Sequence, residues 1–377
     1  MFTVRSGIRC ILFILSVILV VQCKKEKPES LVLINDNNFL NALIERGVDT
    51  NGDGQITDEE AEDVISLDVY SYDISDLGGI EAFINLDTLI CADNHLNTLD
   101  LSHNKKLIYL NCEKNLLEVL DVTENTELVQ IWCSYNLFKT LDLSKNIALE
   151  TLYCHHNQLT SLDISMNDSL RYLHCSDNLL TYIDLSKNFN LINFYGYQNP
   201  ITQIDVSKNN KLGRLSINDC NLSNLDVSVN INLSYLVCSG NYLNGLDVSH
   251  NTLLKRIYCD NCNLSELDVS KNPTLYELQC SGNKLTNLDL TNNTGLMILK
   301  CASNLLTTLD LSKNTVLGLM EHYCMIDLDL SQMPTLSKVC VWVTPFPPPP
   351  PFPDDCYKLI INSDGSPNIF FTTDCSK

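Results

Sequence analysis

A short segment near the amino terminus spaces oxygen-bearing side chains at regular intervals. They stand at the first, third, fifth, seventh, ninth and twelfth places of one loop, and they are Asp49, Asn51, Asp53, Gln55, Thr57 and Glu60. Calcium prefers carboxylate and carbonyl oxygens, and this spacing can wrap such ligands around one ion, with Gln55 contributing its backbone carbonyl. Gly54, at the sixth place, allows the sharp turn that the loop needs. The segment therefore predicts a metal site with calcium as the cofactor.

This loop resembles that of an EF-hand, and the apolar segment 39–48 before it is typical of a helix. The resemblance implies either a calcium sensor or a calcium ion that holds a cap together. A single loop beside a long repeat array favours the structural role, because repeat arrays need caps over their exposed ends. We expect a small helical, EF-hand-like cap over residues 38–85.

A second group of residues could bind a ligand through aromatic rings. Its members are Trp132, Tyr135, Tyr153, His155, His156, Tyr172, His174, Tyr195 and Tyr197, with Tyr109, Tyr235 and Tyr258 as a sparser extension. Aromatic side chains with polar tips are frequent at protein-binding hot spots, and their faces can stack on sugar rings. Tyrosine is also favoured in strands for structural reasons, so a purely structural interpretation stays open beside a ligand site.

Catalysis finds little support in the residues. The sequence has no GxSxG, no HExxH and no glycine-rich phosphate loop. A metal site made of His155, His156 and His174 is a minor hypothesis, because no acidic residues stand ready to orient these ligands. We therefore expect a binding protein and no enzymatic activity.

The aromatic group lies within an array of repeats. From Leu86 to Val316 the pattern LxxLxCxxNxLxxLDLSxNxx recurs eleven times, each copy 21 residues long. Gly196 and Ile217 stand at the cysteine position of the sixth and seventh copies, and Phe194 replaces a leucine. Alternating apolar positions in LxxLxC predict a short strand, and stacking one strand per repeat about 4.8 Å apart predicts a parallel sheet. The second half of each copy has similar spacing and predicts a second strand-like side. A twelfth copy, which begins at Leu317, is two residues short and predicts the end of the array.

Single positions of the repeat form columns along the array. The cysteine column predicts small buried side chains with free thiols, since bridges between in-register neighbours would distort the sheet. Two asparagine columns predict side-chain amides that satisfy backbone groups of the adjacent coil. An aspartate column from Asp100 to Asp310, continuing to Asp329, needs compensation for its mutual repulsion. Hydrogen bonds from the following Ser or Thr and from backbone N–H groups are favoured, and bound cations are the alternative.

The amino-terminal residues predict export. Residues 1–22 combine basic residues with an apolar run too short to span a bilayer, as a signal peptide does. Cys23 follows directly, as in the lipobox of bacterial lipoproteins, and is the expected lipidation site. Gln22 departs from the small residue usual there, so simple secretion is the alternative. Residues 23–37 form a tether, and Lys24 differs from an inner-membrane retention signal, which favours attachment to the outer membrane. Surface display there is a hypothesis.

The carboxyl-terminal residues 336–377 predict a second cap. Residues 339–343 and 368–373 are β-prone, and the nearly continuous prolines of 345–353 are interpreted as a strap over the last coil or as a spacer. Three cysteines outside the column are Cys340, Cys356 and Cys375. We expect one disulfide and prefer Cys340–Cys375 over the other two pairings.

With 46 acidic against 25 basic residues, the chain has a net charge of −21, which excludes nucleic acid as a partner. Its repeats resemble the nested 21-residue class of internalin-like bacterial surface lipoproteins. The resemblance implies a leucine-rich-repeat solenoid over 86–335 that is used for adhesion or ligand capture through its concave parallel sheet. We expect a monomeric, lipid-anchored surface protein with a protein ligand. Capture of a surface glycan by the aromatic rings is the alternative, and a passive spacer is a third hypothesis.

Overall fold

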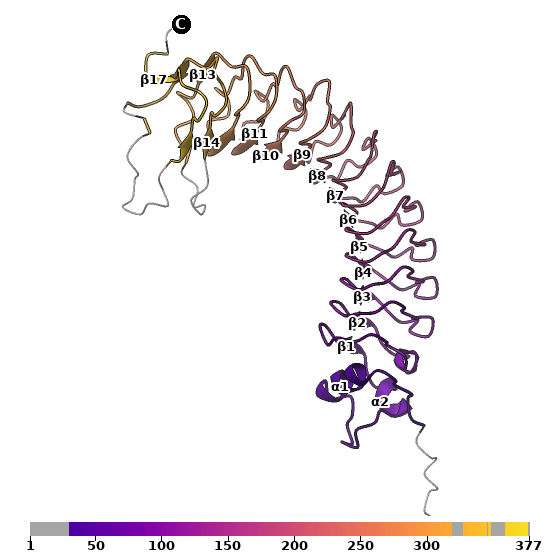
Figure 1. Cartoon of the computed structure of the whole chain (residues 1–377). Coiled ribbons are helices and arrows are strands. Elements are labelled where there is room, and N and C mark those ends of the chain that lie inside the picture. The colour runs from indigo at the N-terminus through magenta and orange to yellow at the C-terminus, as the bar shows by residue number, and fades with distance from the viewer. Residues whose placement is uncertain (1–29, 319–326, 345, 348–358, 376–377) are drawn as a thin grey trace, which may run out of the picture.

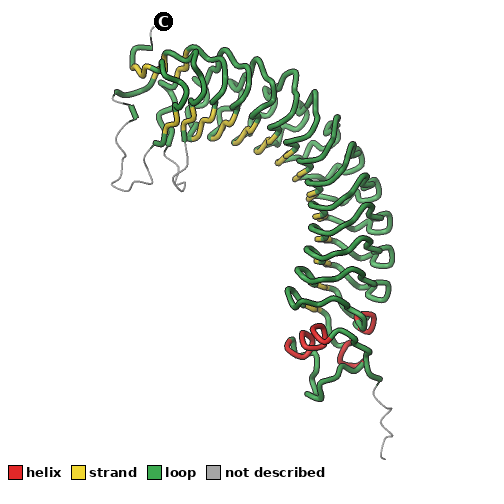
Figure 2. Tube along the Cα trace, viewed as in Figure 1, coloured by secondary structure: helices red, strands yellow, loops and turns green. Residues whose placement is uncertain are grey.

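The chain folds into a curved solenoid of stacked coils, as the sequence predicted. The computed structural model describes residues 30–318, 327–344, 346–347 and 359–375. The coils form an arch, with two short helices at its amino-terminal end (Figure 1). Strands line the inner, concave side of the arch, and loops and turns make up nearly all of the rest (Figure 2). Residues 1–29, with the expected signal peptide and Cys23, lie outside the described part.

The amino-terminal helices are α1 (Asn37–Glu45) and α2 (Asp58–Glu62). Asp36 caps α1, because its Oδ1 accepts from the backbone N–H groups of Asn38 and Phe39. The other carboxylate oxygen of Asp36 accepts from Ser75 and Asp76 of the first coil. One side chain therefore both starts the helix and bonds the cap to the solenoid. A 3-10 turn, η1 (Ile80–Ala82), follows in that coil.

The concave sheet is parallel and has fourteen strands among the described residues. In spatial order they are β1 (Ser66–Asp68), β2 (Thr88–Ile90), β3 (Tyr109–Asn111), β4 (Gln130–Trp132), β5 (Thr151–Tyr153), β6 (Tyr172–His174), β7 (Asn193–Tyr195), β8 (Arg214–Ser216), β9 (Tyr235–Val237), β10 (Arg256–Tyr258), β11 (Glu277–Gln279), β12 (Ile298–Lys300), β14 (Leu328–Asp329) and β16 (Ile361–Asn362). The middle residue of each three-residue strand is buried, as Leu152 is. The first and third residues therefore face the concave side.

The interior is made by the repeated residues. The cysteines of the column are fully buried and free, as expected, and they are Cys91, Cys112, Cys133, Cys154, Cys175, Cys238, Cys259, Cys280 and Cys301. Asn115 shows the first asparagine column: its amide donates to the Cys91 carbonyl of the preceding coil at 3.0 Å, and its oxygen accepts from Leu96 N–H at 3.0 Å. In the second column the Asn125 amide donates to the carbonyls of Leu101 and Asn104, both at 2.9 Å. Each coil is therefore bonded to its predecessor through buried amides.

The expected second strand-like side forms at one end only. Among the described residues, strands on that side are β13 (Thr308–Asp310), β15 (Lys338–Cys340) and β17 (Phe370–Thr372), which pair in parallel. Elsewhere on it one isolated bridge joins Asp100 to Asp121. The arch bends towards the concave sheet (Figure 1). Curvature spreads the outer halves of the coils, so their backbones lie too far apart for a continuous ladder.

The prediction that the twelfth copy is two residues short was wrong. Leu328 pairs with Leu299 in the concave sheet, so this coil is longer than 21 residues, and 319–326 within it lie outside the described part. Asp329 stands opposite Lys300 on the concave sheet and does not continue the aspartate column. Leu330 and Met333 are fully buried three places apart, as Cys and Asn are in other coils. The residues LDLS at 328–331, which in other coils belong to the outer half, therefore lie in the inner, concave half of this coil.

The carboxyl-terminal segment continues the solenoid. Strands β16 and β17 extend the concave and outer sheets, respectively. Cys340 is bonded to Cys375, with 5.5 Å between their Cα atoms, in the pairing preferred from the sequence. Phe346 packs against Trp342 and Phe371, with ring centroids 5.2 Å and 5.1 Å away. Cys356 and most of the proline segment lie outside the described residues. No helix of the described part is both long and apolar enough to cross a membrane.

Candidate ligand-binding site

Aromatic side chains form a continuous row on the concave sheet. Trp132, Tyr153, His174 and Tyr195 occupy the third position of the adjacent strands β4 to β7. Successive ring centroids lie 4.9, 5.8 and 5.2 Å apart. The strands pair in register, so side chains at one repeat position must lie side by side.

A second row comes from the turns that follow these strands. His155 stacks on His174, with centroids 3.9 Å apart and an interplanar angle of 15°. Tyr135 stacks on His156 at 4.3 Å, and Tyr197 lies 5.7 Å from His174. Eight of the nine predicted site residues therefore belong to one network of rings.

Tyr172, the ninth predicted residue, stands apart from this network. It occupies the first position of β6, on the other outward-facing column of the sheet. The guanidinium of Arg171 lies 5.8 Å from its ring centroid. Tyr172 therefore faces the concave side, as the other rings do, and lies at the edge of the ring network.

The histidines at the centre of the network are uncharged at neutral pH. Burial, together with the neighbouring imidazoles His174 and His156, lowers the pKa of His155 to about 3. Burial and His156 lower the pKa of His174 to about 4. Each ring also has a hydroxyl partner: Ser134 lies 2.7 Å from His155 Nδ1, and Ser176 lies 2.8 Å from His174 Nε2. Around His155 and His174 the site therefore offers apolar surface and hydrogen bonds, and at its edge His156 Nε2 lies 3.5 Å from the Asp177 carboxylate.

The three histidines do not make a metal site. In the described part of the chain, the group whose ligand atoms all lie within 4.8 Å of one another consists of Asp310, Cys340 and Cys375. The two cysteines of that group form a disulfide and offer no thiolate. The minor hypothesis of a three-histidine centre is therefore not supported by the geometry.

A hollow of about 450 Å³ lies at one end of the aromatic row. Its lining residues are Tyr153, His174, Tyr195, Tyr197, Ser216, Tyr235, Val237 and Tyr258. Ser216 and Val237 hold the third position of β8 and β9, between Tyr195 on one side and Tyr258 on the other. Because these two side chains are shorter than the rings on either side, they leave the space that forms the hollow. Ser216 and Val237 were not predicted from the sequence, where the signal for them is an interruption in an aromatic column.

A charged network borders the hollow. Glu277 is 6% exposed and pairs with Arg256, with 3.0 Å between Oε2 and Nε. Its Oε1 accepts from the Tyr258 hydroxyl at 2.7 Å and from Gln279 Nε2 at 2.8 Å. Burial and the nearby Glu277 carboxylate raise the pKa of Tyr258 well above its usual range. Tyr258 is thus held as a neutral phenol at the wall of the hollow.

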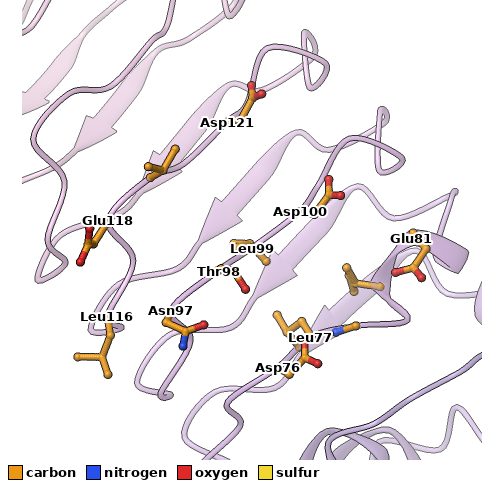
Figure 3. A pocket seen from close by; sticks show the side chains of 13 residues that line it. Asp76, Leu77, Glu81, Asn97, Thr98, Leu99, Asp100, Leu116, Glu118 and Asp121 are labelled. Atoms are coloured by element: carbon orange, nitrogen blue, oxygen red, sulfur yellow. Dashed lines mark hydrogen bonds between the residues drawn. The ribbon is translucent and has the colours of Figure 1, made fainter.

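A larger hollow, of about 500 Å³, lies beside the amino-terminal cap and is acidic (Figure 3). Asp76, Glu81, Asp100, Glu118 and Asp121 line it, with apolar side chains between them. Asp100 and Asp121 each accept from a backbone N–H two residues on, at 2.9 and 3.0 Å. These bonds favour the hydrogen-bonding interpretation of the aspartate column. The carboxylates of Asp100 and Asp121 therefore stabilise their own turns. No aromatic ring lines this hollow.

A curved parallel solenoid with one short strand and a buried leucine core per coil defines a leucine-rich-repeat protein. A scan against protein-family models and a search of curated proteins found no match. Among solved structures, the functional domain of InlJ from Listeria monocytogenes, which includes a cysteine ladder, is 31% identical with a TM-score of 0.64. The match covers 76% of this chain and 70% of that domain. The chain therefore belongs to the internalin-like family of leucine-rich-repeat proteins.

Two further structures share the fold alone. The internalin InlF from Listeria monocytogenes is 16% identical, with a TM-score of 0.70, and the match covers 93% of this chain and 98% of InlF. The plant peptide hormone receptor RGFR1, solved in complex with RGF2, is 19% identical with a TM-score of 0.54. That match covers 70% of this chain and 53% of the receptor.

Proposed function

We propose that this chain is a binding protein that captures a protein ligand on its concave sheet. The observation that carries the proposal is the ring network of β4 to β7 beside a hollow of about 450 Å³. The rings occupy outward-facing strand positions and adjoining turns, and His155 and His174 among them are neutral at pH 7. Amphipathic rings around a hollow are typical of protein-binding hot spots.

The packing of the rings favours a protein ligand over a glycan. Stacking on a sugar requires an open ring face. His155 and His174 cover one another, and Trp132 and Tyr153 lie 4.9 Å apart at a tilt of 36°. The network thus presents ring edges and polar tips more than open faces. The peptide hormone receptor RGFR1, which has this fold, was solved in complex with RGF2, and that precedent supports a peptide or protein ligand.

A pull-down tests this proposal. Residues 24–377 would serve as bait beside a variant with Trp132, Tyr153, Tyr172 and Tyr195 all changed to Ala, both in calcium. We expect a partner that the wild type retains and the variant loses. Equal capture by both baits would refute the concave site. A polysaccharide affinity gel, run with the same two proteins, tests the glycan alternative: retardation of the wild type alone would support it.

We further propose that the chain is exported and anchored to the outer membrane through lipid on Cys23. The support is the basic and apolar leader followed by this cysteine. Metabolic labelling with a radioactive fatty acid should mark the wild type and leave a Cys23→Ser variant unlabelled. Protease treatment of intact cells should remove the protein if it is displayed on the surface, and full protection would contradict display.

We also propose that the loop between α1 and α2 binds calcium and stabilises the cap. The donor set fits, because Asp49, Asn51, Asp53 and Glu60 offer the oxygen ligands that calcium prefers. Asp49 shapes the loop by accepting from Gly52 at 2.7 Å and from Gly54 at 2.9 Å. Glu60 reaches back across the loop and accepts from Thr50 N–H at 2.8 Å. The carboxylates face backbone N–H groups here and do not converge on one point.

An amino-terminal segment completes this loop. Val32 N–H donates to the Ile56 carbonyl at 2.8 Å, and Asp58 N–H donates to the Ser30 carbonyl at 2.9 Å. Leu31 and Thr57 thereby form an antiparallel bridge. The end of the expected tether is therefore bonded directly to the loop, and a bound ion would stabilise both.

A further inference from the structure

The charges on the concave strands differ in sign from the chain as a whole. The outward-facing positions of β2 to β12 that carry a formal charge are Arg214, Arg256, Glu277 and Lys300. Three of these four are basic, although acidic residues outnumber basic ones 46 to 25 in the chain. All four lie on β8 to β12, beyond the aromatic row. Asp329 of β14 stands opposite Lys300, so basic side chains are in excess on β8 to β12 alone, and we call this part of the concave strands the basic strip.

Two arginines flank one tyrosine on this strip. Arg214 and Arg256 occupy the first position of β8 and β10, and Tyr235 holds the same position on β9 between them. Their guanidinium carbons lie 5.8 and 5.7 Å from the Tyr235 ring centroid, within the range of a cation–π interaction. Stacking on a shared ring holds both guanidinium groups at the concave surface.

The two arginines differ in their charge partners. Arg256 pairs with the buried Glu277 carboxylate at 3.0 Å, which compensates its charge. Arg214 is exposed, and no carboxylate in the described part of the chain lies within ion-pair distance of it. Asp260, in the turn after β10, is engaged by Ser281 N–H at 2.7 Å. Arg214 thus carries the available positive charge at this place.

Arg214 also borders the hollow. Ser216 of the same strand and Tyr235 of the next strand both line it. Residues two apart on a strand face the same side, so Arg214 and Ser216 project together into the concavity. The rings of Tyr195, Tyr197 and Tyr258 form the rest of the wall. A ligand that places one side chain in the hollow would therefore place the next group along its chain beside the Arg214 guanidinium.

We propose that this corner of the groove recognises an acidic peptide segment of the protein ligand, with an apolar or aromatic side chain in the hollow and an adjacent carboxylate paired with Arg214. The proposal rests on the concave binding function and names the chemistry of its ligand. A guanidinium group pairs with a carboxylate in a fixed geometry. Arg256, the other arginine beside Tyr235, already has Glu277 as its carboxylate partner. The basic strip attracts acidic segments to the concave side.

The test selects ligands without assuming their identity. A random peptide library displayed on phage is panned against residues 24–377, and the peptide enriched most is synthesised with a fluorophore. Its dissociation constant is then measured by fluorescence anisotropy for the wild type, Arg214→Glu, and Ser216→Trp, whose indole would fill the hollow. Arg171→Glu is the matched control, because Arg171 is also exposed beside a tyrosine but lies next to Glu150 at 3.6 Å.

We expect enriched peptides that place Asp or Glu next to an apolar or aromatic residue. Arg214→Glu and Ser216→Trp should each weaken binding about tenfold or more, and Arg171→Glu should leave it unchanged. Exchanging the peptide's acid for Lys should restore binding to Arg214→Glu. Circular dichroism on every variant separates lost binding from lost folding. Failure to enrich acidic peptides, or equal binding by Arg214→Glu and wild type, would overturn the proposal.

The pull-down distinguishes a wrong ligand chemistry from a wrong binding surface. Suppose that the quadruple alanine variant loses its partner in the pull-down while Arg214→Glu keeps it. The concave function then stands and the acidic ligand chemistry is wrong. If neither variant loses the partner, both proposals are wrong.

Discussion

The side-chain amide of Asn136 donates a hydrogen bond of 3.0 Å to the carbonyl oxygen of Cys112 in the preceding coil. Its oxygen accepts from Leu117 N–H of that same coil at 3.1 Å. One buried side chain therefore satisfies two backbone groups that no strand pairing reaches. This bond recurs along the array and holds the turns of successive coils together.

Replacing Asn136 with Leu should destabilise the solenoid. The Leu117 N–H would be left buried without a partner, at a cost of about 1–3 kcal/mol, whereas the Cys112 carbonyl would keep its bond from the Asn115 amide at 3.1 Å. Cys262 provides the matched comparison, because it holds the same repeat position and donates only its thiol, to the Cys238 carbonyl at 3.1 Å. We expect Cys262→Asn to be neutral or stabilising. Urea denaturation checks both, and equal effects of the two variants would contradict the role given to the amide.

Phe194 and Gly196 are coupled. A Cβ atom on Gly196 would lie 2.5 Å from the Phe194 ring, so glycine replaces the repeat's cysteine where phenylalanine replaces its leucine. Restoring the cysteine alone, with Gly196→Cys, should destabilise the fold by about 1–3 kcal/mol through overpacking. The double variant Phe194→Leu with Gly196→Cys should recover most of that loss. Strictly additive free energies of unfolding would show that the two positions are independent.

The period of 21 residues was enough to predict the solenoid, the buried columns and the side on which the aromatic rings lie, because register follows from an unbroken repeat. The end of the array could not be predicted. The LDLS letters at Leu328 fit both halves of a coil, and only the pairing of Leu328 with Leu299 assigns them to the inner half. The hollow was missed for another reason: it exists because Ser216 and Val237 are shorter than their neighbours.

Stability should fall as the pH drops from about 6.5 towards 4. In the unfolded chain a histidine takes up its proton near pH 6.5, whereas the folded state holds the pKa of His155 at about 3 and that of His174 at about 4. The unfolded state therefore binds more protons in this window, so acid favours unfolding. The stability that these neutral rings provide is complete above pH 6.5.

Comparing unfolding curves of the wild type and a His155→Gln, His174→Gln double variant between pH 7 and pH 4 isolates this effect from that of the carboxylates. We expect the variant to lose less stability over the window. An identical pH dependence in the two proteins would mean that the histidines take up protons equally well in the folded state.

Calcium should raise the unfolding midpoint of the cap. An ion that binds only the folded state stabilises it by about 2.7 kcal/mol at one hundred times its Kd. Asp49→Asn removes a ligand charge and should reduce this gain, whereas Glu59→Gln changes an exposed acid outside the ligand set and should preserve it. Thermal unfolding with calcium or chelator measures the difference. A gain that survives Asp49→Asn in full would place the ion elsewhere, for example on the aspartate column.

The most direct test of the concave site is photocrosslinking from inside it. Tyr197, which lines the hollow, is replaced by p-benzoylphenylalanine, and the control places the same residue at Tyr182, a 60% exposed tyrosine in the second half of its coil. Both variants are illuminated in a mixture of the proteins that surround the cells that produce this chain. If the concave groove binds the partner, we expect a discrete crosslinked partner from position 197 and none from position 182. A partner captured from position 182 alone would show that the concave groove is not the binding surface.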